Sequence, residues 1–239
     1  MEKRRCTAIV LAAGQGKRMG SKIQKQFLEI QGKPIVYYSL AVFQNSPLID
    51  QILLVTGQDQ IDFCQNEIVK KYGFSKVTAV TAGGAERYAS VWKGLQRIKA
   101  EGSEADQRGM VFIHDGVRPF ISEEILERAA CAVEAYQACV IGMPSKDTIK
   151  IADENGFVAD TPARKLVWTI QTPQVFDFEL AYRAYAALEE SGRTDVTDDA
   201  MIVEAFTDVK VRLVEGSYEN IKITTPEDLE IAEAFLKRL

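Results

Sequence analysis

Short apolar runs alternate with longer amphipathic segments along most of the chain. The apolar runs, rich in valine, isoleucine, leucine and alanine, predict strands at residues 7–12, 51–56, 77–82, 110–114, 138–143 and 209–214. Continuous apolar runs of this length are typical of strands in a parallel sheet that is buried on both faces. Their alternation with helical segments predicts a doubly wound, mostly parallel α/β sheet with right-handed crossovers.

Two of the predicted helices begin with recognisable capping residues. Ser122 precedes two glutamates and a stretch in which apolar residues recur at helical spacing. Thr225 precedes Pro226, at the first helical position, and then two acids. Both patterns favour a helix that starts directly after the capping residue, because the cap and the acids satisfy the exposed N–H groups and the positive end of the helix dipole.

One segment breaks the alternation of strands and helices. Residues 148–152 and 157–159 predict a short hairpin around Asp153-Glu154-Asn155-Gly156, since Asn-Gly is a strong turn signal. A hairpin inserted into a doubly wound sheet tends to project from it. The sequence contains no repeat, low-complexity tract or linker, so we expect residues 1–239 to form one domain with a β-arm at about residues 145–166.

Composition and charge narrow the class of protein. The chain has 239 residues, 46% hydrophobic and 26% charged, which is ordinary for a globular α/β protein. Its formal net charge of −5 argues against nucleic acid as a partner. Residues 1–33 nevertheless contain far more Lys and Arg than Asp and Glu, and composition alone leaves open whether they bind a small anion or only solubilise the N-terminus.

Membrane and extracellular classes are not favoured by the sequence. No apolar run approaches the roughly 20 residues needed to span a bilayer. The chain reaches an apolar run by Thr7, which leaves no room for a leader peptide. None of the four cysteines forms a C-x-x-C pair. We therefore expect a cytoplasmic protein whose cysteines are reduced packing residues, with no membrane partner.

A glycine-rich loop follows the first predicted strand. It reads Gly14-Gln15-Gly16-Lys17-Arg18-Met19-Gly20, and glycines here let backbone N–H groups approach phosphates closely. It is not a P-loop, because Met19 and Ser21 stand where the second glycine is required. It also departs from the dinucleotide fingerprint, because Met19 replaces the third glycine and no acid ends the second strand. What remains, L-A-A-G-x-G-x-R-M followed by K-Q-F-L, resembles the signature loop of nucleotide-sugar-type pyrophosphorylases.

The cations of this loop suit a reaction between two phosphate groups. Two unit charges about 4 Å apart repel by roughly 4 kcal/mol at an effective dielectric near 20. A triphosphate and a phosphate monoester therefore need positive side chains between them, and Arg18 and Lys25 are the candidates. The alternative is a glycine turn that happens to carry surface cations.

The fourth predicted strand ends in His114-Asp115-Gly116-Val117-Arg118-Pro119. Ligands bind at the carboxyl ends of strands in open α/β sheets, and hard cations prefer oxygen ligands, so Asp115 is the first candidate for a metal ligand. We expect Arg118 to organise the loop by pairing with a carboxylate. An attacking phosphate is already mostly ionised near neutral pH (second pKa about 6), so no base is needed and His114 is expected to be structural.

Three further segments are ambiguous on the residues alone. Gly83-Gly84-Ala85-Glu86-Arg87 leads through Ser90 into a helix and either contacts a base or ribose or only forms a turn. Lys222, in a predicted short strand among apolar residues, must reach an anion or the surface. The polar clusters 169–176 and 194–200 are expected between elements, where Thr197 could simply cap a helix from Asp198.

In order along the chain, these motifs resemble the methylerythritol phosphate cytidylyltransferase family over about residues 6–237. The resemblance rests on the segments A-I-V-L-A-A-G-Q-G-K-R-M, K-Q-F-L, G-G-A-E-R-Y-A-S-V, H-D-G-V-R-P-F, K-D-T-I-K, R-K-L-V-W-T-I-Q-T-P-Q-V-F, T-D-D-A and N-I-K-I-T-T-P-E-D-L. The resemblance implies transfer of the cytidylyl group of CTP to 2-C-methyl-D-erythritol 4-phosphate, with release of pyrophosphate, in isoprenoid precursor synthesis. It also implies Mg²⁺ as cofactor.

The resemblance assigns a role to each matching position. Charge in the transition state would be stabilised by Arg18, Lys25 and Lys222. The nucleotide phosphates and ribose would be held by Ala12, Ala13 and Gly14, and cytosine would be read by Gly84 and Ser90. The metal would be held by Asp115. The methylerythritol phosphate would be bound by Thr148, Arg164 and Thr197.

The same resemblance implies a homodimer in which the arm crosses a two-fold axis, so that Thr148 and Arg164 serve the partner's site. Two positions depart from some relatives. Ala85 and Glu219 each stand where an aspartate is found, which leaves Glu219 a doubtful second metal ligand. The alternatives are a ribitol 5-phosphate cytidylyltransferase, whose first loop usually reads A-G-G rather than the A-A-G found here, and a nucleotide-binding regulator without catalysis.

Overall fold

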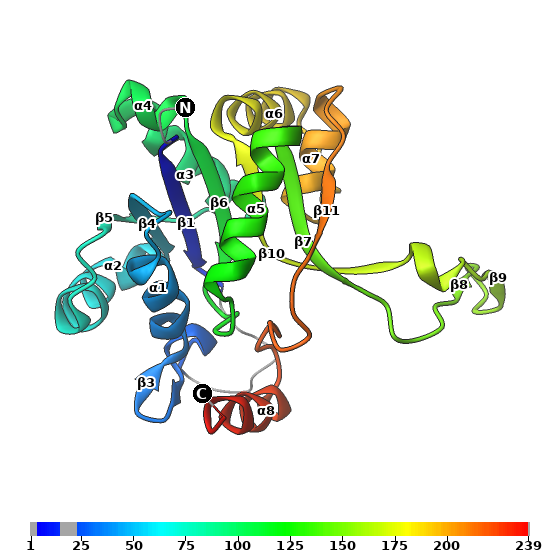
Figure 1. The fold of residues 1–239 in the computed structure, drawn as a ribbon, viewed down its shortest axis with the longest axis horizontal. Coiled ribbons are helices and arrows are strands. Elements are labelled where there is room, and N and C mark those ends of the chain that lie inside the picture. The colour runs from blue at the N-terminus through cyan, green and yellow to red at the C-terminus, as the bar shows by residue number, and fades with distance from the viewer. Residues whose placement is uncertain (1–3, 15–22, 239) are drawn as a thin grey trace.

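The computed structural model describes residues 4–14 and 23–238, and its centre is a seven-stranded sheet in the order β11-β7-β10-β6-β1-β4-β5 (Figure 1). The strands of this sheet are β1 (Cys6–Ala12), β4 (Gln51–Thr56), β5 (Val77–Ala82), β6 (Met110–Asp115), β7 (Ala138–Pro144), β10 (Trp168–Asp177) and β11 (Arg212–Glu215). Only β10 runs antiparallel to its neighbours, β6 and β7, and the remaining pairs are parallel. The predicted mostly parallel α/β sheet is confirmed.

Helices cover both faces of the sheet. Their bounds are α1 (Ile35–Asn45), α2 (Ile61–Phe63), α3 (Arg87–Glu101), α4 (Glu104–Gln107), α5 (Glu123–Tyr136), α6 (Phe178–Ser191), α7 (Asp199–Phe206) and α8 (Pro226–Leu236), with short turns of other helix types at η2 (Lys25–Phe27), η3 (Gln58–Gln60), η4 (Cys64–Lys70) and η5 (Arg164–Leu166). In Figure 1, α1 and α5 lie in front of the sheet.

Alternate side chains of the strands enter two separate apolar cores. Ala8 and Val10 of β1 join the core under α1 and α5, whereas Ile9 joins the core under α3, α6 and α7. This alternation is what a strand buried on both faces requires, because successive side chains point to opposite faces. A third, smaller cluster joins Ile223 and α8 to the turn after β6.

The strand β10 was not expected from the sequence. Its residues 169–176 were assigned to a polar cluster between elements, and that interpretation is wrong. The polar side chains Gln171, Thr172 and Gln174 are buried in the sheet, and each has hydrogen-bond partners. Because these buried residues are polar and hydrogen-bonded, this part of the strand lacks the apolar run from which a buried strand is predicted. The last predicted strand, at 209–214, also begins later than expected, at Arg212.

The helix starts agree with the sequence in part. Thr225 and Asp228 form a capping box at the start of α8, with Pro226 in the first turn, as predicted. Ser122 occupies the cap position of α5, but its side chain makes no capping hydrogen bond. At α7 the cap is Asp198, whose carboxylate accepts from Met201 N at 2.9 Å, so Thr197 is not the cap.

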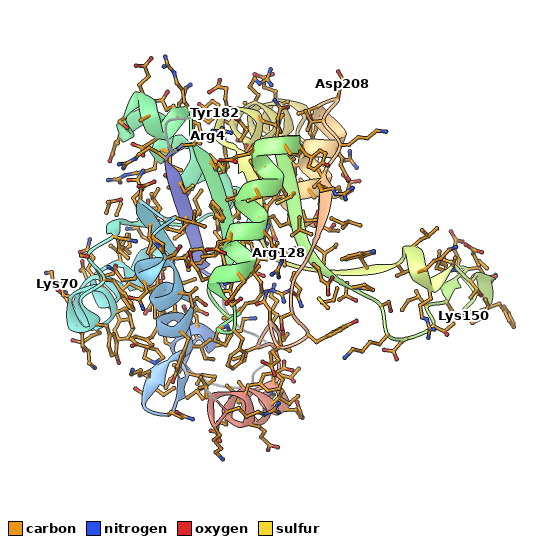
Figure 2. All side chains as sticks on the ribbon, in the orientation of Figure 1. Arg4, Lys70, Arg128, Lys150, Tyr182 and Asp208 are labelled. Atoms are coloured by element: carbon orange, nitrogen blue, oxygen red, sulfur yellow. The ribbon has the colours of Figure 1, made fainter. Side chains whose placement is uncertain are left out.

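The predicted hairpin is confirmed, with a first strand shorter than expected and a second strand displaced by one residue. It pairs β8 (Ile151–Ala152) with β9 (Val158–Asp160), and it projects from the body of the molecule, with Lys150 labelled on it in Figure 2. Asp153 fixes the turn by accepting from the N–H groups of Asn155 and Phe157, each at 2.9 Å. Large apolar side chains on the arm are exposed, among them Phe157 at 72% and Leu166 at 74%.

Two small strands, β2 (Glu29–Ile30) and β3 (Lys33–Pro34), form a separate pair before α1. Within residues 4–14 and 23–238, none of the helices has the length and apolar character needed to cross a bilayer.

Candidate active site

A cavity of about 180 Å³ lies where β1 and β6 end. Strand register places Leu11 of β1 beside Asp115 of β6, so the two motifs that follow these strands meet at one edge of the sheet. The cavity is lined by Leu11, Ala12, Ala13, Gly14, Lys25, Gln26, Gly84, Ala85, Glu86, Arg87, Ser90, Asp115, Val117 and Lys222. Eight residues proposed from the sequence for nucleotide, charge or metal binding are therefore brought together: Ala12, Ala13, Gly14, Lys25, Gly84, Ser90, Asp115 and Lys222.

The turn before α3 is packed so closely that two glycines are required. A Cβ atom on Gly83 would lie 2.8 Å from the Cβ of Ala13, and one on Gly84 would lie 2.4 Å from the Cβ of Ala89. The Ser90 hydroxyl accepts from Gly84 N at 3.0 Å and donates to the carbonyl of Glu86 at 3.1 Å. Ser90 thus fixes the turn against the first residues of the helix.

Lys25 reaches the cavity because its neighbour Gln26 is anchored to the first strand. The buried Gln26 side chain donates from Nε2 to the carbonyl of Ala12 at 2.6 Å. The Lys25 ammonium donates to the carbonyl of Ile223 at 3.2 Å, which links the K-Q-F-L segment to the C-terminal tail.

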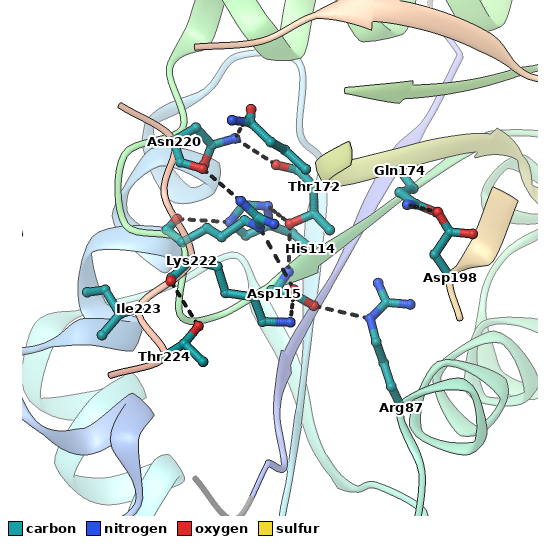
Figure 3. A network of polar contacts seen from close by, with 12 residues as sticks. Arg87, His114, Asp115, Thr172, Gln174, Asp198, Asn220, Lys222, Ile223 and Thr224 are labelled. Carbon is teal, nitrogen blue, oxygen red and sulfur yellow. Dashed lines mark hydrogen bonds and ion pairs between the residues drawn. The ribbon is translucent and has the colours of Figure 1, made fainter. Parts of the chain in front are cut away.

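Asp115 is the centre of a charged cluster (Figure 3). Its carboxylate lies 2.8 Å from Lys222 Nζ and 3.2 Å from Arg87 Nε, and 3.9 Å separates its second oxygen from Arg118 Nε. Burial favours the neutral form, but the three neighbouring positive charges outweigh burial and hold the pKa of Asp115 well below its usual range. Asp115 is therefore an ionised carboxylate that lines the cavity.

Lys222 is delivered to this cluster by the tail rather than by a strand. Residues 221–224 have no regular secondary structure, so the predicted short strand is wrong. The buried Asn220 side chain holds the tail by donating to the carbonyl of Thr172 at 2.9 Å, and the Arg118 guanidinium donates to the carbonyl of Asn220 at 2.8 Å. On the far side of Lys222, Ile223 N donates to the carbonyl of Val117 at 2.9 Å.

His114 has the contacts of a structural residue, as the sequence indicated. It is buried, and burial lowers its pKa to about 4, so the ring is neutral near pH 7. Its Nε2 lies 3.1 Å from the carbonyl of Arg118, where it must donate, and its Nδ1 accepts from the Thr172 hydroxyl at 3.0 Å. The same hydroxyl accepts from Asp115 N at 3.1 Å, so His114 and Thr172 orient the turn that carries Asp115.

Sequence reasoning assigned no role to Arg87. Its guanidinium contacts Asp115 and makes two hydrogen bonds to Asp199, at 2.7 and 2.8 Å. A signal was present, because Arg87 is the first residue of α3 and the first turn of that helix contains no acid. A cation at the positive end of a helix dipole is unfavourable unless an anion balances it.

The remaining predicted residues lie elsewhere. Arg18 falls within residues 15–22, outside the described part of the chain. Thr197 lines a neighbouring cavity of about 200 Å³ that shares Glu86 and Arg87 with the first. Thr148 and Arg164 flank the β8–β9 hairpin in the sequence and do not line this chain's own cavity, and Figure 1 shows that the arm projects away from the body.

Glu219 is not part of the Asp115 cluster. It lines a separate cavity beside Phe120 and pairs with Arg238, its Oε1 lying 3.5 Å from Nη1. Within residues 4–14 and 23–238, no group of three or more His, Cys, Asp or Glu side chains is arranged to hold a metal. A metal at Asp115 would need most of its ligands from a bound phosphate chain or water, and Mg²⁺ is commonly held in that way.

The sequence and the fold both have close counterparts among known proteins. The family model described as 2-C-methyl-D-erythritol 4-phosphate cytidylyltransferase matches residues 6–238. A protein of that name from Lachnospira eligens is 49% identical over 232 residues, covering 97% of this chain and 99% of its own. Another, from Lachnoclostridium phytofermentans, is 48% identical over 237 residues, covering 99% of this chain and 97% of its own.

Among solved structures, 4-diphosphocytidyl-2C-methyl-D-erythritol synthase from Anaerococcus prevotii superposes with a TM-score of 0.84 at 36% identity, over 99% of this chain and 98% of that one. The 2-C-methyl-D-erythritol 4-phosphate cytidylyltransferase of Francisella tularensis gives a TM-score of 0.79 at 30% identity, over 96% of this chain and 99% of that one.

Proposed function

The chain belongs to the 2-C-methyl-D-erythritol 4-phosphate cytidylyltransferase family, and from this we infer how its cavity carries out the reaction. The chain is a nucleotidyltransferase that joins the cytidylyl group of CTP to 2-C-methyl-D-erythritol 4-phosphate in the isoprenoid pathway. The observation that carries the mechanism is the meeting of Lys25, Lys222 and Asp115 in one cavity beside a glycine turn.

CTP binds, in this proposal, at the carboxyl edge of the sheet. The backbone of Ala12, Ala13 and Gly14 follows the nucleotide phosphates and ribose, and the turn at Gly84, fixed by Ser90, reads the cytosine. Gly84 lines the cavity, and a turn without a side chain lets a base approach the backbone, which supports this role.

In the chemical step, a phosphate oxygen of the acceptor attacks the α-phosphorus of CTP in line. A new P–O bond forms as the bond to the β-phosphate breaks, and pyrophosphate leaves with the electron pair. Lys25, Lys222 and Arg18 stabilise the charge that accumulates on the phosphate oxygens. The acceptor phosphate is ionised, so no side chain has to remove a proton.

The proposed cofactor is Mg²⁺, and the residues present fit it. Asp115 is ionised and lies in the cavity, and one carboxylate together with phosphate oxygens suffices for this ion. Bound Mg²⁺ would neutralise charge on the triphosphate. Lys222, 2.8 Å from Asp115 Oδ2, keeps that carboxylate directed into the cavity. Glu219 has no part in this site, since it pairs with Arg238 outside the cavity.

The acceptor site is proposed to be shared between two copies of the chain. Thr197 lines the cavity next to the nucleotide cavity and would bind the acceptor from the same chain. Thr148 and Arg164, on the arm, would reach the partner's cavity. A two-stranded hairpin with exposed apolar residues such as Phe157 and Leu166 is marginal on its own, which supports an obligate homodimer with exchanged arms.

We further propose that the whole chain acts as one nucleotidyltransferase domain in the cytoplasm. Cys64, Cys131 and Cys139 are free thiols, and Cys64 and Cys139 are buried. Free thiols persist in a reducing compartment, which favours this location.

A pyrophosphate-release assay tests the proposal. Release is expected with CTP, Mg²⁺ and methylerythritol phosphate together, and little is expected when ribitol 5-phosphate replaces the acceptor or UTP replaces CTP. Faster release with ribitol 5-phosphate would show a ribitol phosphate enzyme instead. No release with any acceptor, while CTP still binds, would show a nucleotide-binding regulator.

A further inference from the structure

Arg87, together with Glu86, lines two neighbouring cavities. Its side chain lines the cavity that contains Asp115 and also the neighbouring one that contains Thr197. Its Nε donates to Asp115 at 3.2 Å, on the nucleotide side. The other end of the guanidinium is bound to Asp199, the first residue of α7, just after the Thr197 loop. One planar group therefore connects two sites that the reaction must bring together.

Asp199 is buried, and its carboxylate accepts hydrogen bonds from Arg87 and Tyr185 that fix its orientation. Both of its oxygens accept from Arg87, from Nη1 at 2.7 Å and from Nη2 at 2.8 Å. The hydroxyl of Tyr185, a buried residue of α6, donates to one of the same oxygens. Burial raises the pKa of Tyr185 well above its usual value, which keeps this hydroxyl a donor. Asp199 is 0% exposed and is not among the residues that line either cavity.

The start of α7 is also tied to the central sheet. The side chain of Gln174, in β10, donates to Asp198 at 2.9 Å and accepts from Ala200 N at 2.9 Å. Asp199 lies between these two contacts, so its position is set by the sheet rather than by the surface loop. A bidentate pair between arginine and carboxylate fixes orientation as well as distance, and lysine cannot replace it.

We propose that Asp199 is a positioning residue of the reaction: held by Tyr185, it orients Arg87, and Arg87 in turn aligns Asp115 in the nucleotide cavity with the acceptor cavity. The inference rests on the proposed use of these two cavities by CTP and the acceptor. Asp199 does not touch either substrate. Its loss would leave each substrate able to bind while the two are no longer aligned.

The test is the variant Asp199→Asn, which keeps the size of the side chain and removes its charge. We expect kcat per folded chain to fall by about 10- to 100-fold, the loss that follows a misplacement of about 1 Å. The KM for CTP should change little, because the backbone that lines the nucleotide cavity is untouched. In the double variant Arg87→Ala with Asp199→Asn, kcat should equal that of Arg87→Ala alone, because Asp199 acts through Arg87.

The matched control is Asp106→Asn. Asp106 is also a buried carboxylate that pairs with an arginine, Arg5, at 3.1 Å, but it lines none of the cavities described above. This variant should lower the melting temperature and leave kcat unchanged. If Asp199→Asn likewise lowers only the melting temperature, Asp199 is merely structural and the proposal is overturned.

A second variant covers the case in which Asp199→Asn does not fold. Tyr185→Phe removes one hydroxyl and keeps the ring in the core. A fall in kcat, smaller than that of Asp199→Asn and without a change in the KM for CTP, supports the proposal, and a wild-type kcat overturns it. The wild-type chain is measured in the same assay, so that failure of this proposal can be distinguished from failure of the proposed function. If the wild-type chain releases no pyrophosphate, it is the proposed reaction that has failed.

Discussion

Replacing Lys222 by methionine tests the electrostatic basis of the reaction. The Lys222 ammonium lies 2.8 Å from Asp115 Oδ2 and lines the nucleotide cavity together with Lys25. Methionine has a similar length and no charge, so the variant removes the cation and leaves most of the packing. Asp115 keeps a cation at 3.2 Å, the Nε of Arg87, so the carboxylate stays ionised.

The size of the effect follows from the position of the charge. A unit positive charge about 4 Å from a unit phosphate charge contributes roughly 4 kcal/mol at an effective dielectric near 20. That energy corresponds to about 10³ in rate. The Lys222 side chain is 38% exposed, so water and salt reduce the contribution. We therefore expect kcat to fall by about 10²- to 10³-fold, and by a larger factor at low salt, where the charge of Lys222 is less screened.

The assay is steady-state pyrophosphate release at saturating CTP, methylerythritol phosphate and Mg²⁺, with circular dichroism to confirm folding. Lys76→Met is the control, because Lys76 is also half-buried and donates to a backbone carbonyl, that of Ser46, at 2.6 Å. A Lys222→Met enzyme within threefold of the wild-type kcat would show that this cation does not stabilise the transition state.

Three further outcomes are expected. Mixing Arg164→Ala chains with Lys25→Ala chains should restore activity, because one site of the mixed dimer is intact; no recovery in verified mixed dimers would mean that the arm serves its own chain. Gly84→Ala should raise the KM for CTP, because the new Cβ would lie 2.4 Å from the Cβ of Ala89 and displace the turn; an unchanged KM would contradict this reading. Lowering the pH from 6.5 to 4 should reduce the free energy of unfolding by on the order of 3 kcal/mol because of His114. The pKa of His114 is about 4 in the folded chain, so in this pH range it is mainly the unfolded chain that binds the proton. Urea titrations of the wild type and His114→Gln at both pH values measure this difference, and an equal loss in the two proteins would refute it.

The sequence determined the parallel part of the sheet because its strands are buried on both faces. Such strands must be continuous apolar runs, and the bounds 51–56 and 77–82 agree with β4 and β5 without change. Local chemistry likewise determined the arm, since its turn at residues 153–156 depends on contacts within four residues. The capping box of α8 is equally local, and it too was predicted.

The meeting of the motifs after β1 and β6 at one edge of the sheet was also predictable, for a topological reason. Motifs that directly follow the strands of a parallel sheet are brought to the same edge by the fold itself. Gly14, after β1, and Asp115, at the end of β6, therefore had to lie close together once the sheet was known. Lys25 and Lys222 share the cavity with them, although they are far apart in sequence.

Only the tertiary structure decided which buried polar groups are paired. The middle of β10 shows no apolar pattern, because Gln171, Thr172 and Gln174 are buried with partners that come from distant segments. The pairing of Arg87 with Asp199 joins residues 112 positions apart, and nothing in either local sequence specifies the other. Long-range pairing of this kind leaves no periodic signal, since it depends on where α3 and α7 meet beside the sheet. The sequence determined which chemistry the chain carries, and the fold determined how its charged groups are held in place.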